Sequence, residues 1–224
     1  MAFGVALFAV AFAAALVPIA WHAYTEYQDS RISPVVASPA QFEEIFGIAL
    51  SAIDPQGEPL PPPAPGEPPR PVEQKPVVLL DETITFCEGQ ASANSLCEPD
   101  VDETILYPGI DSQIPQGFRK ELVAANRAPA HIKCHESLRV HCAKPEAVYA
   151  LLRANGAWHN FYAKFPNTAG LINASNIVLS KDGSTALAYI TYGCGSMCGA
   201  GTLVLLKRGE ATWVAVKQVR VFDV

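Results

Sequence analysis

Two cysteines in a glycine-rich stretch are the first candidates for chemistry. Cys194 and Cys198 are separated by three residues, and residues 193–201 contain four glycines. Glycine permits the backbone angles that a tight loop closed by a disulfide requires. The alternative is thiol–disulfide exchange, because the backbone N–H groups of such a loop can stabilise a thiolate. Active-site dithiols typically have two intervening residues and open a helix, so the sequence favours a structural disulfide over an oxidoreductase.

A second candidate lies in the twelve residues from His131 to Cys142, which include three histidines and two cysteines. Zinc and copper prefer imidazole and thiolate ligands, so His131, His135 and His141 are candidate ligands of one such ion. Cys134 and Cys142 are eight residues apart and can instead pair in an oxidising compartment, which leaves only histidines for a metal. We therefore predict a disulfide here, with a histidine-based copper or zinc site as the alternative.

The remaining pair is Cys87 and Cys97, which flank a polar stretch. An even set of six cysteines indicates an oxidising compartment, and bridges between sequence neighbours are the simplest pairing. A bridge around the 87–97 loop would stabilise the fold by about 3 kcal/mol in a chain-entropy estimate. No G-x-S-x-G, H-E-x-x-H or P-loop motif is present, so the sequence predicts neither catalytic residues nor a cofactor and favours a non-enzymatic role.

The start of the chain is apolar. Residues 2–21 contain no charged side chain, and a helix of this length just crosses a hydrocarbon core about 30 Å thick. Lysine and arginine are absent before Arg31, and Pro18 and Trp21 disturb the site that a signal peptidase would cut, so an uncleaved anchor is favoured over a signal peptide. With the cysteines, residues 1–21 predict an inner-membrane protein of a bacterial envelope that faces the periplasm. If the segment is removed, a secreted or periplasmic protein is expected.

The charge of the chain bears on its partners. The net charge is −6 over 224 residues, with acidic and basic side chains mixed along the sequence. A nucleic-acid-binding protein needs a basic surface to neutralise phosphates. We therefore expect no nucleic-acid partner. The expected partners are the membrane, through the N-terminal helix, and another envelope protein or the cell wall.

The sequence divides into four parts. After residues 1–21, residues 22–54 are expected to form a juxtamembrane segment, in which Ser38, Pro39 and Gln41 predict the start of an amphipathic helix. The apolar stripe of this helix needs a partner surface, which is the membrane, the main domain or a second copy. Ten of the 22 residues from 55 to 76 are proline, so this linker is expected to be extended and to act as a spacer. Residues 77–224 have the length of one extracytoplasmic domain.

Strands dominate the last quarter of that domain. Residues 176–180, 185–192, 202–207 and 212–222 are β-rich, and turn sequences such as Asp182-Gly183 separate them. This pattern predicts an antiparallel β-meander. The middle strands are apolar on both faces, which indicates that both faces are covered.

Earlier segments of the domain predict shorter elements. Residues 77–80 and 83–86 are expected to be strands, and residues 115–125 a short helix that Pro115 opens. A second helix is expected to begin at Pro145, and an aromatic stripe from Trp158 to Phe165 is expected to pack on the sheet. The predicted fold class is therefore α+β, an antiparallel meander packed with a few short helices and stapled by disulfides.

The second half of the chain also carries a set of motifs. They are a W..FY..FP...G stretch from Trp158 to Gly170 with Ser175 after it, Ala186, a CG..CG.G loop from Cys194 to Gly201, Leu205-Leu206 and Trp213. This pattern resembles a group of uncharacterised bacterial secreted or lipid-anchored proteins, over roughly residues 80–216. The resemblance implies an extracytoplasmic α+β domain and no particular activity. The proline-rich linker and the 131–142 segment depart from the pattern of the group.

These observations predict a membrane-anchored envelope protein that acts as a binding module. A copper- or zinc-binding protein and a thiol–disulfide oxidoreductase are the alternatives.

Overall fold

The structure is a computed structural model that describes residues 35–53, 75–86, 105, 114–134 and 140–224. The expectations for the N-terminal helix, for Cys87 and Cys97 and for His135 lie outside the described residues. Within them, no helix has both the length and the apolar character needed to cross a membrane.

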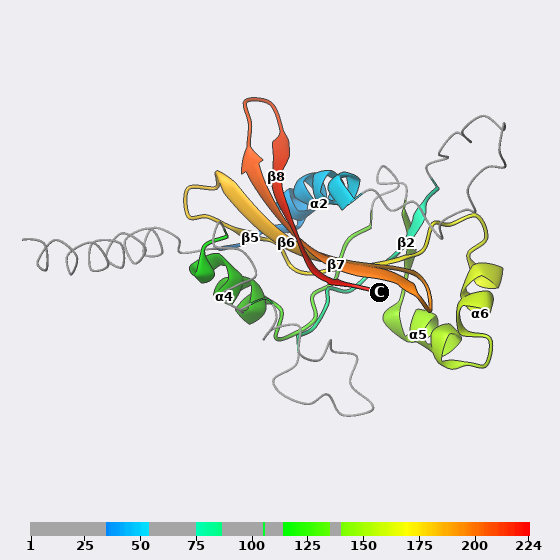
Figure 1. Ribbon diagram of the computed structural model, residues 1–224. Helices are drawn as coiled ribbons and strands as arrows, with labels where there is room; N and C mark the ends of the chain where they lie inside the picture. Colours follow the sequence, from blue (N-terminus) through cyan, green and yellow to red (C-terminus); the bar gives the residue numbers. More distant parts are fainter. Residues whose placement is uncertain (1–34, 54–74, 87–104, 106–113, 135–139) are drawn as a thin grey trace, which may run out of the picture.

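The described chain has an α+β fold, built from a curled sheet with helices around it (Figure 1). In chain order the elements are β1 (Val35–Val36), α2 (Pro39–Ile53), β2 (Val77–Leu80), α4 (Gln116–Ala125), β3 (Val140–Ala143), α5 (Pro145–Arg153), α6 (Ala157–Lys164), β4 (Leu171–Ala174), β5 (Val178–Leu179), β6 (Thr185–Gly195), β7 (Cys198–Arg208) and β8 (Trp213–Asp223). The predicted helices at 115–125 and from Pro145 are confirmed.

The sheet is mixed rather than wholly antiparallel. The predicted meander is confirmed for β6, β7 and β8, which pair antiparallel in sequence order. The other edge of β6 pairs antiparallel with both β4 and β5. In contrast, β2 runs parallel to β3 and to β4. The chain leaves β3 through α5 and α6 before it enters β4, and such a helical crossover is what brings two strands back in the same direction.

The segment predicted as a strand at 83–86 is not one of the strands of this sheet. Its backbone N–H groups donate instead to loop and strand-end carbonyls: Thr83 to Ala130 at 2.8 Å and Ile84 to Ala174 at 2.8 Å. This segment therefore fastens the 126–132 loop to the end of β4.

Both faces of the long strands are covered, as predicted. Side chains alternate along a strand, so neighbouring residues of β6 and β7 enter different cores. One core contains Ala186, Ala188, Ile190, Val204 and Leu206, together with the inner face of α2. The opposite core contains Leu187, Tyr189, Leu203 and Leu205, together with Phe118 and Leu122 of α4.

The partner surface of α2 is the main sheet. The helix begins after Ser38, whose backbone N–H donates to the side-chain oxygen of Gln41 at 3.0 Å. Ile45 and Phe46 are fully buried in the core beneath the helix. At its other end, the side chain of Gln218 on β8 donates to the carbonyl of Ala52 at 3.0 Å. Helix α2 and strand β2 bury side chains in the same core, and residues 55–74 of the predicted linker between them lie outside the described residues.

The aromatic stripe packs on the short strands, as predicted. Phe161 of α6 is fully buried against β2 and β4. The ring centroids of Trp158 and Phe165 lie 5.1 and 5.2 Å from the ring centroid of Phe161. Helices α5 and α6 thus close the end of the sheet at which β6 turns into β7 (Figure 1).

Candidate functional site

The turn between β6 and β7 carries the glycine-rich cysteine pair. We call residues 193–199 the β6–β7 tip. Gly195 pairs with Cys198, so Ser196 and Met197 make the turn between the two strands. The register shifts between Gly193 and Gly195, which places Cys194 at a bulge. A β-bulge re-aims a side chain, and here the bulged residue is the one whose sulfur crosses to Cys198.

Both disulfides that fall on described residues are confirmed. Cys194 and Cys198 are bonded, with their Cα atoms 5.2 Å apart, and Cys134 and Cys142 are bonded with their Cα atoms 6.2 Å apart. Cys194 is fully buried, whereas Cys198 is partly exposed. The Cys194–Cys198 pair joins two strands, which differs from the helix-opening position of thiol-exchange sites.

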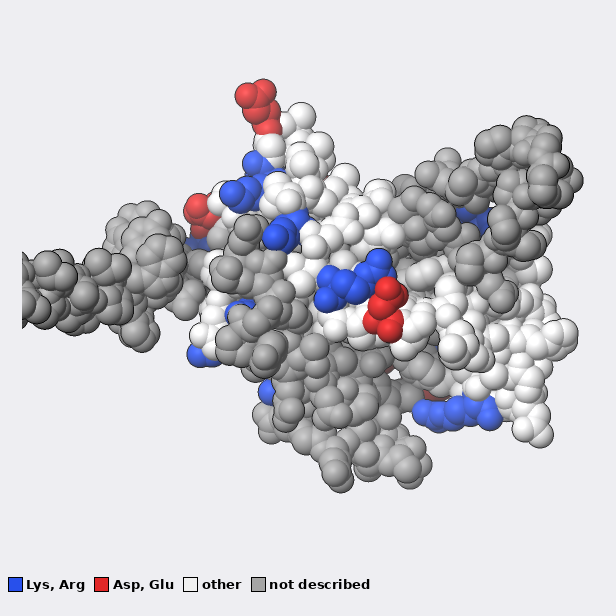
Figure 2. Space-filling view, in the orientation of Figure 1, with Lys and Arg blue, Asp and Glu red and all other residues white. Residues whose placement is uncertain are grey.

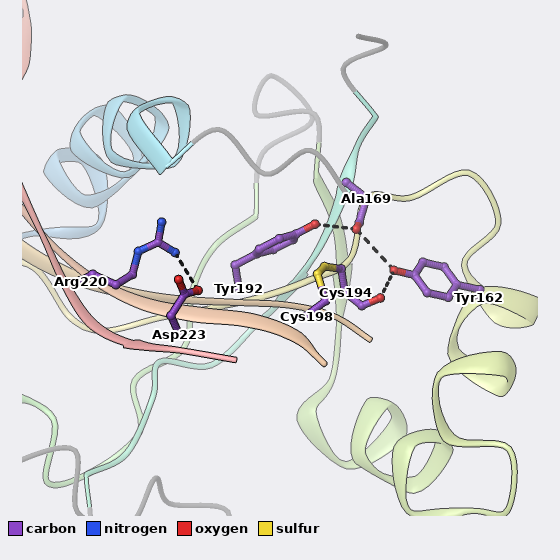
Figure 3. Close-up of a disulfide and its surroundings, with 7 residues drawn as sticks. All are labelled: Tyr162, Ala169, Tyr192, Cys194, Cys198, Arg220 and Asp223. Atoms are coloured by element: carbon purple, nitrogen blue, oxygen red, sulfur yellow. Dashed lines mark hydrogen bonds and ion pairs between the residues drawn. A yellow bond between two sulfur atoms is a disulfide. The ribbon is translucent and has the colours of Figure 1, made fainter. Parts of the chain in front are cut away.

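Two tyrosines hold the tip against the α6 side of the fold (Figure 3). The hydroxyl of Tyr162, on α6, donates to the carbonyl of Cys194 at 2.9 Å. The hydroxyl of Tyr192, on β6, donates to the carbonyl of Ala169 at 2.9 Å, and Tyr162 also approaches that carbonyl, at 3.4 Å. The tip is therefore fixed by its disulfide and by a hydrogen bond from α6, and Tyr192 just before it is bonded to the loop that precedes β4.

Glycine at two positions is required by close approach. A Cβ atom at Gly193 would lie 3.2 Å from the indole ring of Trp158. A Cβ atom at Gly201 would meet the hydroxyl of Tyr189, and the ring of Phe222 at 2.5 Å. The glycines of this stretch therefore serve packing as much as loop conformation.

Exposed apolar side chains gather at the same end of the sheet. Met197 at the turn is 87% exposed, Val224 is 68% exposed and Phe222 is 37% exposed. The backbone of Val224 pairs with that of Gly199 through two hydrogen bonds of 2.9 and 3.2 Å, so the end of the chain lies directly beside the tip. We call Met197, Phe222 and Val224 the tip patch. Sequence reasoning missed this patch, because it depends on how the last residues pair with β7.

A charged pair lies on the same stretch of β8 as Phe222 of this patch. Arg220 and Asp223 form an ion pair of 3.6 Å whose side chains are largely exposed, and such a pair adds little to stability. On the face seen in Figure 2, the end of the molecule where α5 and α6 lie is mostly uncharged, and more of the charged side chains lie over the hairpins at the other end. The tip patch therefore has an ion pair directly beside Phe222 and Val224, its two residues at the end of the chain.

The two described histidines of the 131–142 segment lie opposite different residues. His131 is exposed and pairs with Glu82 in an isolated bridge. His141 is exposed on β3, where it lies opposite Val78. The Cys134–Cys142 bond occupies both thiols of the segment. Among the described residues no three potential metal ligands come together, and because His135 lies outside them, the histidine-based metal site stays a prediction.

The turn between β5 and β6 contains one carboxyl group with a shifted pKa. The hydroxyl of Ser180 donates to Asp182 at 2.6 Å, and the backbone N–H and hydroxyl of Ser184 donate at 3.0 and 2.8 Å. These bonds favour the ionised form, and they lower the pKa of Asp182 from 3.8 to about 2. Asp182 is therefore a turn residue, as its sequence context predicts.

Comparisons with known proteins found no match to this chain. No protein-family model, no curated protein and no solved structure matches this chain. The resemblance to a bacterial secreted or lipid-anchored group stays a prediction, and the function has to be argued from the chain's own geometry.

Proposed function

We propose that this chain is a membrane-anchored protein of the bacterial envelope, that it acts as a non-enzymatic binding module, and that the tip patch is its binding surface for another envelope protein or the cell wall. The sequence alone supports the membrane anchor and the periplasmic compartment. One observation supports the binding surface: exposed apolar side chains lie both in the disulfide-bonded turn, at Met197, and at the end of the chain next to it, at Phe222 and Val224.

Two physical arguments support this assignment. Single apolar residues on a surface are ordinary, whereas a group of them on one rigid feature is typical of an interaction site. In addition, binding loses less conformational entropy when the binding surface is already ordered. The Cys194–Cys198 bond and the hydrogen bond from Tyr162 order the tip before any partner arrives.

Site-directed photocrosslinking in native cells tests the proposal. A benzophenone amino acid in place of Met197 is expected to yield a discrete adduct with one envelope component. The same amino acid in place of Glu210, an exposed residue in the turn between β7 and β8, is the position control and is expected to yield none.

Matched substitutions on β8 give the specificity control. Phe222→Asp should reduce the adduct formed from position 197 by at least tenfold, because it places a charge within the patch. Val214→Asp makes the same kind of change at the other end of the strand, where the side chain is 51% exposed, and should leave the adduct unchanged. Equal adducts from positions 197 and 210, or equal effects of the two substitutions, would remove the tip patch as the binding surface.

A further inference from the structure

A partly open hollow lies where the segment after β2 meets α5 and β4. Its volume is about 80 Å³, which is room for several water molecules or for a small organic group. Its apolar walls include Leu80, Ile84, Pro145 and Tyr149, and its polar lining includes Glu82 and Asn173. We call it the β2–α5 hollow. It shares no residue with the tip patch.

The walls of the hollow are fixed by backbone hydrogen bonds. Thr83 and Ala130 are joined twice, since the N–H of Thr83 donates to the Ala130 carbonyl at 2.8 Å and the N–H of Ala130 donates to the Thr83 hydroxyl at 2.9 Å. The N–H of Ile84 donates to the Ala174 carbonyl at 2.8 Å. A site held in this way needs little ordering when a ligand enters.

The polar groups that line the hollow are a carboxylate, two threonine hydroxyls and an amide, from Glu82, Thr83, Thr85 and Asn173. Glu82 is the only charged side chain among the described residues that line it. The side-chain N–H of Asn173 donates to the Thr191 hydroxyl at 3.1 Å, while its Oδ1 atom is buried and accepts no hydrogen bond from a described residue. This atom has almost no accessible surface, so a ligand in the hollow would not reach it.

The surroundings are compatible with a positive charge. Helix α5 begins at the hollow, but its first residue, Pro145, has no N–H, and Glu146 in the first turn offsets the partial positive charge of the helix end. The guanidinium of Arg153 already lies 5.9 Å from the centre of the Tyr149 ring, which is a cation–π contact. This ring borders the hollow, so Arg153 is a cation near the hollow, and the carboxylate of Glu82 has to outweigh its repulsion of a second cation.

From these observations we propose that the β2–α5 hollow binds a primary ammonium group carried on a short apolar chain, as in a lysine side chain or a small alkylamine. An ammonium has three N–H donors and no acceptor. One donor would bond to the carboxylate of Glu82 as a charge-assisted hydrogen bond, and the others would meet the hydroxyl oxygens of Thr83 and Thr85, which also line the hollow. The methylene groups would lie against the apolar walls. This inference does not depend on the tip patch.

Ligand titration of the full-length protein in detergent, followed by NMR, tests the inference. The probe is n-butylammonium, and butan-1-ol and butyrate are comparators of the same chain length. We expect n-butylammonium to bind at least tenfold more tightly than either comparator, because only it supplies both the charge and the donors. A titration with Nα-acetyl-lysine amide identifies the source: comparable affinity indicates a lysine side chain of a partner protein, and affinity at least tenfold weaker indicates a free amine.

Three variants connect the binding to the hollow. Glu82→Gln removes the charge and should weaken n-butylammonium binding about tenfold or more. Glu82→Asp keeps the charge on a side chain one methylene shorter, and its affinity for n-butylammonium should lie between those of the wild type and Glu82→Gln. Glu121→Gln makes the same charge change at an exposed position on α4 and should have no effect. Equal binding of the three probes, or unchanged affinity in Glu82→Gln that keeps the wild-type melting temperature, would overturn the assignment.

Discussion

Replacement of Phe46 by alanine tests whether α2 belongs to the same folded unit as the sheet. The apolar stripe of this helix has three conceivable partners, namely a membrane, a second copy or the chain's own sheet. Phe46 is fully buried in the core that α2 shares with β6 and β7, and its ring stacks on that of Phe42 at 5.4 Å. Only the third partner makes the stability of the whole domain depend on this side chain.

The expected magnitude follows from complete burial. Truncation of a buried phenylalanine to alanine costs about 3–5 kcal/mol, since both transfer free energy and packing are lost. In a domain of this size each kcal/mol lowers the melting temperature by about 2–4 °C. Phe46→Ala should therefore lower the melting temperature by about 6–20 °C.

Thermal unfolding of the full-length protein in detergent, monitored by near-ultraviolet circular dichroism, is a suitable assay. Glu44→Ala is the matched control, because Glu44 is exposed on the same helix and its loss should change stability by less than about 0.5 kcal/mol. The reasoning is refuted if both variants melt within 1 °C of each other. A Phe46→Ala effect that appears only as altered oligomeric state would instead indicate a second copy as the partner.

Three further predictions concern the turn, the glycines and the disulfides. The pKa of Asp182 should be about 2, so its contribution to stability is complete above about pH 4 and is lost as the pH falls through 2; in a carboxyl NMR titration, Ser180→Ala should raise this pKa toward 3.8. Gly201→Ala should destabilise the domain by about 1–3 kcal/mol in denaturant titrations through overpacking. Gly195→Ala, whose Cβ would have no contact closer than 3.7 Å, should cost less, and equal effects would contradict the packing argument. Alkylation without a reductant should leave all four described cysteines unmodified in intact-mass measurements, and a modified one would contradict the disulfide assignment.

Local patterns in the sequence predicted the elements whose structure is decided locally. The meander of β6, β7 and β8 follows from β-rich runs separated by turns such as Asp182-Gly183, and its strands are long enough for that signal to be clear. Prolines at helix starts located α4 and α5 in the same way. The 194–198 and 134–142 disulfides could be predicted because the two cysteines of each pair are close in sequence.

Non-local pairing explains what the sequence did not reveal. Strands β2, β3 and β4 have four residues each, which is too short for a periodic pattern, and their parallel pairing depends on contacts between distant segments. The tip patch likewise requires Val224 to pair with Gly199. The β2–α5 hollow brings together Glu82, Tyr149 and Asn173 from three separate parts of the chain, and no spacing rule connects them.

The docking of α2 also limits how far this protein can reach. Because β1 pairs with β5 and α2 packs on the sheet, the described fold already includes Val35. If residues 1–21 span the bilayer, only the thirteen residues from 22 to 34 connect the membrane-spanning segment to β1. Fully extended, a segment of this length reaches at most about 45 Å. A domain connected to the membrane by so short a segment would meet its partners close to the membrane surface, and would not extend across the periplasm toward the outer membrane.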